Sequence, residues 1–108
     1  MRYERTDSFE ADYNRLSPAE RELFRAAVKE FNESCDQFIL NRDWSSFPSD
    51  LRIKHVSGTR GIFEMTWHFS GPDGRATWEW TSVTDGDGQE WPAIRWRRIG
   101  DHDILKAP

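Results

Sequence analysis

The chain has 108 residues, of which 36% are hydrophobic and 14% aromatic, and its formal net charge is −4. This size allows one domain with a single core and excludes two. No apolar run approaches the ~20 residues that cross a bilayer, and the first seven residues lack the apolar segment of a signal peptide. One cysteine cannot form an internal disulfide, which favours the reducing cytoplasm. We therefore expect a single domain over residues 1–108, in the cytoplasm and without a membrane partner.

The first residues predict a short strand over residues 2–6 and then a helix. Apolar residues recur at the helical spacing i, i+4, i+7 at Phe9, Tyr13 and Leu16. Asp7 or Ser8 is suited to accept hydrogen bonds from the free N–H groups of the first turn. The pattern therefore predicts a helix that begins at Asp7 or Ser8.

A second and longer helix begins at Ser17-Pro18-Ala19-Glu20. Ser17 is the expected N-cap, Pro18 fits the first helical position, and Glu20 completes a capping box. Apolar residues then form one stripe at alternating spacings of four and three: Phe24, Val28, Phe31, Cys35 and Phe38. The stripe predicts that this face of the helix packs on the core.

After a polar loop at residues 41–50, the hydrophobic period changes to two, which is the period of a β-strand. Strands are predicted at residues 51–56, 62–69, 75–83 and 93–99, and turns at residues 57–61, 71–74 and 85–88. Helices followed by strands predict an α+β fold. We expect an N-terminal strand and two antiparallel helices packed on one face of an antiparallel sheet, whose other face is polar.

Cations gather in the strand half of the chain. Residues 1–50 hold 7 Arg and Lys against 11 Asp and Glu, whereas residues 51–100 hold 7 against 6. One predicted sheet face collects Arg52, Lys54, Arg75, Arg98 and His102. Arginine, lysine and histidine side chains that converge can bind a phosphodiester and move protons on it. The alternative is that each is a solvated charge paired with a carboxylate on the sheet.

Other motifs give weaker signals. The tryptophans in strands are typical of the core, whereas Trp44 and Trp91 in loops are candidates for stacking on a nucleobase. Residues 85–88 resemble a calcium loop but lack the remaining ligands of an EF-hand. The side chains of residues 101–103 are too close in sequence to aim at one ion. We therefore expect neither a metal nor a cofactor.

Several segments, taken in order and spacing, resemble the RelE/ParE toxin superfamily over nearly the whole chain. They are Phe9 with Leu16-Ser17, the long second helix, Leu51-Arg52-Ile53-Lys54, Gly61-Ile62-Phe63-Glu64-Met65, Gly74-Arg75, and the basic strand that ends near Arg98 and His102. The resemblance implies a RelE-like fold and a toxin of a type II toxin–antitoxin system. Its activity would be ribosome-dependent cleavage of mRNA without a metal, with the 2′-hydroxyl as nucleophile.

The resemblance also implies roles for single residues. Arg52 and Lys54 match basic residues that hold RNA and assist activation of the 2′-hydroxyl. Arg75 matches the arginine that stabilises charge on the phosphate, and Arg98 or His102 falls where the family has its leaving-group acid. Further RNA contacts are expected from Arg60, Arg95 and Arg97. The expected partners are a cognate antitoxin protein, the ribosome and mRNA.

Two other functions remain compatible with the same fold. ParE-like members inhibit DNA gyrase and need no RNase site, and a non-toxic interaction domain is a third interpretation. The positions of four side chains in space distinguish these functions. If Arg52, Lys54, Arg75 and His102 converge in one phosphate-sized concavity, cleavage of RNA is favoured. If they are scattered, the binding functions are favoured.

Overall fold

A computed structural model describes residues 1–68 and 73–108. The helices and strands follow in the order β1 (Arg2–Arg5), α1 (Asp7–Arg15), α2 (Pro18–Asn41), β2 (Lys54–His55), β3 (Ile62–Trp67), β4 (Gly74–Thr84) and β5 (Glu90–Gly100). Short 3₁₀ helices lie at η1 (Trp44–Ser46), η2 (Ser49–Leu51) and η3 (His102–Lys106). Within the described residues, neither α-helix has the length and apolar character needed to cross a bilayer.

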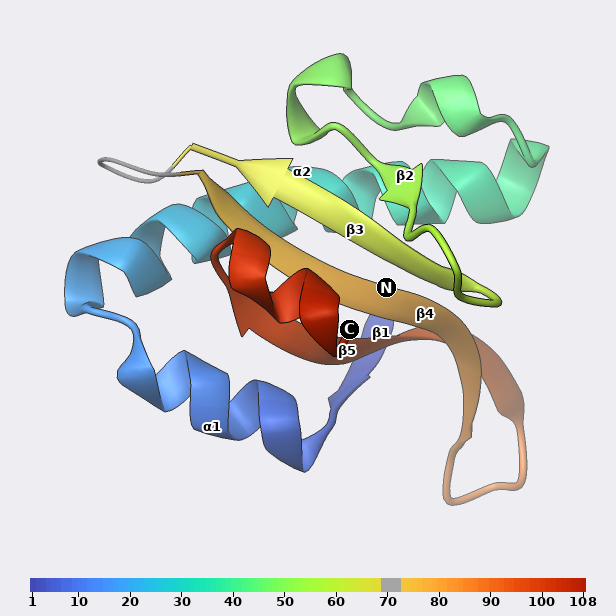
Figure 1. Cartoon of the computed structure of the whole chain (residues 1–108). Coiled ribbons are helices and arrows are strands. Elements are labelled where there is room, and N and C mark those ends of the chain that lie inside the picture. The colour runs from blue at the N-terminus through green and yellow to red at the C-terminus, as the bar shows by residue number, and fades with distance from the viewer. Residues whose placement is uncertain (69–72) are drawn as a thin grey trace.

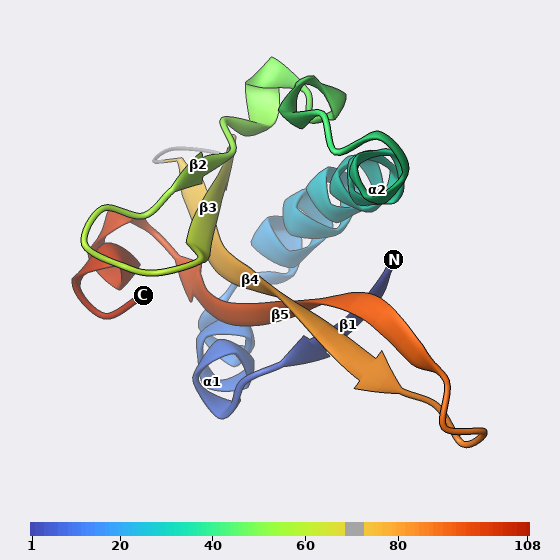
Figure 2. The same ribbon diagram turned by 90° about the vertical axis from the view of Figure 1, so that its right-hand side faces the viewer.

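In residues 1–68 and 73–108 the fold is α+β, with two α-helices and one open, mixed sheet of five strands in the order β1-β5-β4-β3-β2. Figures 1 and 2 show α2 on one face of this sheet and the C-terminal η3 on the other. The prediction of an entirely antiparallel sheet was wrong at one position, because β1 pairs with β5 in parallel. Nearly the whole chain separates these two strands, so no tight hairpin forces them to be antiparallel.

The helix starts follow the local signals closely. At α2, Ser17 Oγ accepts from the Glu20 N–H at 3.1 Å, and the Ser17 N–H donates to Glu20 Oε1 at 2.9 Å, which confirms the capping box. At α1 the N-cap is Thr6 and not Asp7 or Ser8. Thr6 Oγ1 accepts from the Phe9 N–H and also donates to the main-chain oxygen of Arg97 at 2.7 Å. A tertiary bond to β5 therefore fixes where α1 begins.

The core lies between α2 and the sheet and consists mainly of aromatic rings. The predicted stripe of α2 is buried at Phe24, Phe31, Cys35 and Phe38 and partly buried at Val28. The ring of Phe31 lies 5.0 Å from that of Trp78, and the ring of Phe24 lies 5.5 Å from that of Trp96. These contacts fix α2 across the middle of the sheet.

The first strand of the second half differs from its prediction. Instead of residues 51–56, only Lys54–His55 form β2, because Ser49–Leu51 turn into a 3₁₀ helix that buries Leu51. Arg52 ends that helix with a left-handed φ of 46°, so Arg52 and Lys54 do not share a strand face. The later strands agree with the predicted period, and the predicted turn at residues 71–74 lies partly outside the described residues.

The second face of the sheet is largely covered, although we expected an exposed polar face. Glu64, Thr66 and Thr77 on this face are buried. The chain after β5 folds back over Thr77, and a main-chain oxygen of Pro108 accepts from Thr77 Oγ1 at 3.0 Å and from Arg97 Nε at 3.1 Å, while Glu64 and Thr66 accept from Arg75. Polar residues alternate along these strands because some of them hydrogen-bond to other parts of the chain, and not only because they contact water.

Candidate functional site

Arg75 and His102 line one open hollow of about 340 Å³, where β4 begins beside η3. We call it the Arg75 hollow; its other lining residues are Asp73, Asp101 and Asp103. The Asp101 carboxylate caps η3 by accepting from the Asp103 N–H at 2.9 Å, which places His102 at the first position of that helix. The hollow thus combines a guanidinium and an imidazole with a rim of carboxylates.

A buried carboxylate holds Arg75 in place. Arg75 Nη1 donates to Glu64 Oε1 at 2.9 Å and to Thr66 Oγ1 at 3.4 Å. The Glu64 side chain is only 3% exposed, so its negative charge is stabilised by its hydrogen-bond partners in place of water. Among the described residues these bonds engage only Nη1 of Arg75, so the rest of the guanidinium fork remains for another acceptor. Arg75 is therefore both fixed and able to bind an anion.

Arg52 and Lys54 lie outside the Arg75 hollow but are linked to it by two carboxylates. Arg52 Nη2 lies 2.7 Å from Asp73 Oδ2, and this hydrogen bond lowers the pKa of the Asp73 carboxyl. Lys54 Nζ lies 3.4 Å from the same Glu64 oxygen that binds Arg75. The four candidate side chains therefore do not converge in one concavity: Arg75 and His102 line the hollow, whereas Arg52 and Lys54 lie outside it and pair with Asp73 and Glu64. This separation favours the binding functions, and the pairing of Arg52, Lys54 and Arg75 with carboxylates agrees with the alternative interpretation of these charges.

Arg98 turns away from the hollow. Arg98 Nε and Nη2 donate to the two carboxylate oxygens of Asp12 on α1, at 2.6 and 3.1 Å, and Nη1 donates to the main-chain oxygen of Ala107. The Ile99 N–H donates to the same carboxylate at 3.2 Å. The hydrogen bond to Asp12 raises the pKa of Arg98, so its guanidinium does not release a proton near neutral pH. Of the two candidates for a general acid, His102 alone fits.

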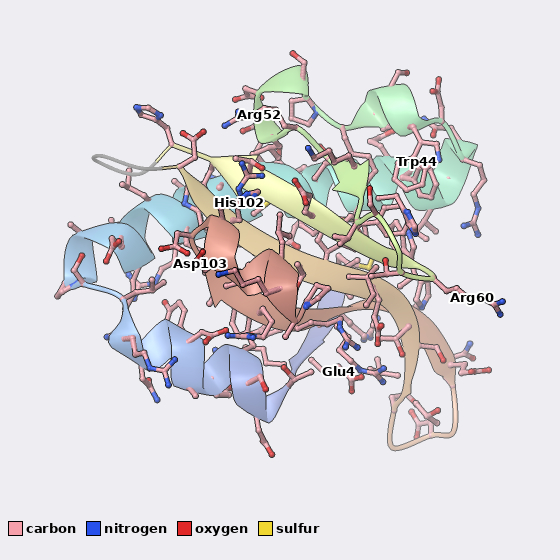
Figure 3. All side chains as sticks on the ribbon, viewed as in Figure 1. Glu4, Trp44, Arg52, Arg60, His102 and Asp103 are labelled. Atoms are coloured by element: carbon pink, nitrogen blue, oxygen red, sulfur yellow. The ribbon has the colours of Figure 1, made fainter. Side chains whose placement is uncertain are left out.

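Three further candidate cations are separate from the hollow. Figure 3 shows Arg60 at the turn before β3, pointing away from the molecule. The guanidinium of Arg95 lies 2.6 Å from Glu79 and 2.7 Å from Glu4, and these hydrogen bonds, that to Glu79 above all, raise its pKa. Arg97 pairs with the same Glu79 at 3.2 Å. Arg95 and Arg97 therefore form an ion-pair network on the sheet with Glu79 and Glu4.

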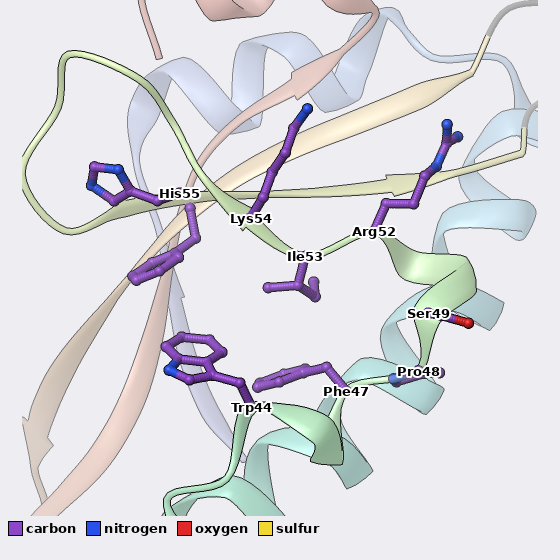
Figure 4. Close-up of a pocket in the computed structure, with 9 residues that line it drawn as sticks. Trp44, Phe47, Pro48, Ser49, Arg52, Ile53, Lys54 and His55 are labelled. Atoms are coloured by element: carbon purple, nitrogen blue, oxygen red, sulfur yellow. The ribbon is translucent and has the colours of Figure 1, made fainter.

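The sequence marked Trp44 as a candidate for stacking on a nucleobase but did not reveal the cavity around it, which we call the Trp44 pocket. It measures about 400 Å³, with apolar walls from Trp44, Phe47, Ile53 and Phe63 and a polar rim of Arg52, Lys54 and His55. Figure 4 shows Ile53 pointing toward Trp44 and Phe47, while Arg52 and Lys54 point to the other side of the chain. The available signal was a pair of aromatic residues, Trp44 and Phe47, inside an otherwise polar loop.

No group of three His, Cys, Asp or Glu side chains within residues 1–68 and 73–108 is arranged to hold a metal ion. At the 85–88 turn the Asp85 carboxylate accepts from the Trp91 indole N–H at 2.8 Å and from the N–H groups of Asp87 and Gln89. Its oxygens thus serve the hairpin, as expected for a turn.

Comparisons of the chain with protein-family models, curated proteins and solved structures find no significant match. The functional conclusion therefore depends on the chemistry of the residues. An arginine with free donors beside an imidazole is suited to bind a phosphodiester and to transfer a proton to it.

Proposed function

We propose that this chain is the toxin of a type II toxin–antitoxin system, a RelE-like, ribosome-dependent mRNA endonuclease. The observation that carries the proposal is that Arg75 and His102, which lie on opposite sides of the β4–β5 hairpin in sequence, line one hollow. The order of a strand, two helices and an antiparallel set of strands supports it further, because the resemblance implied that order.

The proposed reaction uses the RNA, these side chains and water. The 2′-hydroxyl oxygen attacks the neighbouring phosphorus and loses its proton to water, while Lys54 favours the developing oxyanion. The free donors of Arg75 bind the non-bridging oxygens and stabilise the charge of the transition state. His102 gives a proton to the 5′ oxygen as the P–O bond breaks. The products are a 2′,3′-cyclic phosphate and a 5′-hydroxyl.

The test is single-turnover cleavage of ribosome-bound mRNA. We expect His102→Ala to lower the rate by about 10²–10⁴-fold, the range for a general acid. Arg75→Ala should lower it by roughly 10²-fold or more, and Arg75→Lys should recover part of that loss because it keeps a charge beside Glu64 without the fork. Lys29→Ala, on an exposed position of α2, is the control. Wild-type rates for both His102→Ala and Arg75→Ala would exclude this assignment.

The separation of the four candidate side chains favours a second function, in which the chain acts by binding alone, as a ParE-like gyrase inhibitor or a non-toxic interaction domain. Arg52 and Lys54 lie outside the hollow that Arg75 and His102 line. Three carboxylates surround the Arg75 hollow, and Arg52, Lys54 and Arg75 are each paired with an acid. A phosphate has to displace some of these contacts. Expression in bacteria separates the functions, since cuts inside codons support the endonuclease and double-strand DNA breaks support action on gyrase.

The expected protein partner is a cognate antitoxin. Antitoxins commonly cover a toxin with an amphipathic segment, a mode of peptide recognition that uses exposed grooves. Expression of this chain alone should slow growth, and co-expression with the product of an adjacent small gene should relieve the effect. If calorimetry detects no binding between the two purified proteins, the toxin–antitoxin assignment loses its support.

A further inference from the structure

The Trp44 pocket presents an aromatic surface that is held in place yet open to solvent. The Trp44 ring lies 4.5 Å from the ring of Phe38, 5.6 Å from that of Phe47 and 5.2 Å from that of Phe63. Despite these contacts, Trp44 is 47% exposed. A fixed ring that binds a flat ligand loses little conformational entropy on binding, so this surface is pre-organised.

The rim of the pocket carries two cationic side chains, each in an ion pair whose cationic member is largely exposed to solvent. Arg52 and Lys54 have side chains that are 53% and 66% exposed, and each makes one ion pair, with Asp73 and Glu64 respectively. Exposed ion pairs contribute little to stability, so an incoming phosphate can replace the carboxylate at small cost. The pair Arg75–Glu64 is different, because both of its members are largely buried.

Those same two carboxylates connect the Trp44 pocket with the Arg75 hollow. Asp73 lines the hollow and binds Arg52 of the pocket rim, while Glu64 binds both Arg75 of the hollow and Lys54 of the rim. β2, whose Lys54 and His55 line the Trp44 pocket, is one of the two edge strands of the sheet. A chain molecule that passes over this edge therefore meets the hollow, the cations and the aromatic pocket in succession.

We propose that the Trp44 pocket binds a nucleobase of single-stranded RNA that flanks the phosphate held by Arg75, while Arg52 and Lys54 contact the intervening backbone. This inference rests on the proposed endonuclease function and names a subsite of its substrate. Aromatic side chains stack on bases of single strands in a sequence-tolerant way, and arginine and lysine follow the phosphates. The aromatic wall lies on one side of the segment that carries Arg52 and Lys54, and the two cationic side chains point to its other side, so the base and its phosphates would bind on the two sides of this segment.

A peptide segment is the competing occupant, and the geometry favours it less. Addition of a peptide strand requires a long free sheet edge, whereas β2 comprises Lys54 and His55 alone and carries a lysine, which discourages edge pairing. A flat aromatic wall next to two cations suits a base with its phosphates better than an aliphatic side chain.

The experiment measures binding of a fluorescent oligoribonucleotide whose 2′-hydroxyls are methylated, so that no 2′-hydroxyl is available to attack the phosphate. We expect Trp44→Leu to weaken the Kd by about 5- to 150-fold, the range for loss of one base–aromatic stack, and Trp44→Phe to weaken it less. Trp91→Leu is the matched control. Trp91 is also an exposed tryptophan, but Arg2 covers its ring at 4.0 Å and it lies on β5. Thermal unfolding of each variant verifies that it is folded.

The outcomes separate the pocket from the enzyme. If Trp44→Leu binds the oligonucleotide as tightly as the wild type does, and the wild type cleaves mRNA on the ribosome, the pocket assignment is overturned and the endonuclease stands. If binding depends on Trp44 but no mRNA is cleaved, the pocket stands and the endonuclease fails. If instead an antitoxin peptide quenches Trp44 fluorescence and the oligonucleotide does not bind, the pocket is a protein-docking site and the proposal is wrong.

Discussion

Two ion pairs of almost equal length differ in burial, and therefore in how much each contributes to stability. Arg98 lies 2.6 Å from Asp12, where α1 meets β5, and Arg52 lies 2.7 Å from Asp73 at the edge of the sheet. The Asp12 side chain is 5% exposed, whereas that of Arg52 is 53% exposed. A buried charge that loses its partner is costly, but an exposed charge finds water or another ion. The first pair therefore holds the fold, and the second is available for exchange with a ligand.

Glu64 lies between these two extremes. Its buried carboxylate pairs with Arg75, which is mostly buried, and with Lys54, which is mostly exposed. One side of the carboxylate thus has a structural contact and the other an exchangeable one. This arrangement explains how Arg75 is held in a fixed orientation in a hollow that is open to solvent. The following predictions test the ranking of these contacts by burial.

The largest effect is expected at Asp12. Asp12→Ala removes the two carboxylate oxygens that accept from Arg98, one of which also accepts from the Ile99 N–H, so the free energy of unfolding should fall by about 3–5 kcal/mol. Urea denaturation measures the change. The control is Glu22→Ala, which breaks the exposed pair with Arg25 on α2 and should cost no more than about 0.5 kcal/mol. A cost below about 1 kcal/mol at Asp12 would contradict the ranking.

Removal of Arg75 should cost less, because Glu64 keeps Lys54 as a partner. We expect Arg75→Ala to lower the free energy of unfolding by about 1.5–3 kcal/mol, the range for hydrogen bonds to a charged group. In a Glu64→Gln background the same substitution should cost less, since the buried charge is gone. If the two substitutions are additive in a double-mutant cycle, Arg75 and Glu64 do not interact as described.

Lys54→Ala should leave stability within about 0.5 kcal/mol of the wild type, because its ion pair is exposed on the lysine side. The Lys54→Ala substitution is instead expected to change the salt dependence of RNA binding. The dependence of log Kd on log salt should become shallower by about one, as for the loss of one phosphate contact. The measurement is oligonucleotide binding at several salt concentrations. An unchanged slope would place Lys54 outside the path of the RNA.

The smallest expected effect is on the acid titration of Asp73, which pairs with Arg52 at the edge of the sheet. The hydrogen bond from Arg52 lowers the pKa of Asp73, so the pair stabilises the folded state above the ordinary pKa of an aspartate, about 3.9, and this stabilisation is lost as the pH falls through the lowered folded value. In Arg52→Ala the Asp73 pKa should rise toward its ordinary value. A carboxyl titration by NMR measures this. No change would show that Arg52 does not engage Asp73 in solution.

The sequence determined several features that depend on neighbours within one element. The capping box at Ser17 and Glu20 needs four consecutive residues, and the apolar stripe of α2 needs only the helical period. The period of two also gave β3, β4 and β5 and assigned Trp78 and Trp96 to the core. For the same reason, Arg75 and His102 could be selected as chemically suited residues at strand ends.

Tertiary structure decided which elements those residues meet. A strict alternation of side chains between the two faces of β5 does not hold at Arg97 and Arg98, because the register between β4 and β5 shifts there. The shift lets Arg98 reach Asp12 on α1. Strict alternation likewise fails to reveal that residues after β5 cover Thr77, or that Arg52 ends a 3₁₀ helix. Periodicity encodes the side of an element that a residue occupies, but the burial and partner of a charge depend on segments far away in sequence. That burial is what separates a structural ion pair from an exchangeable one.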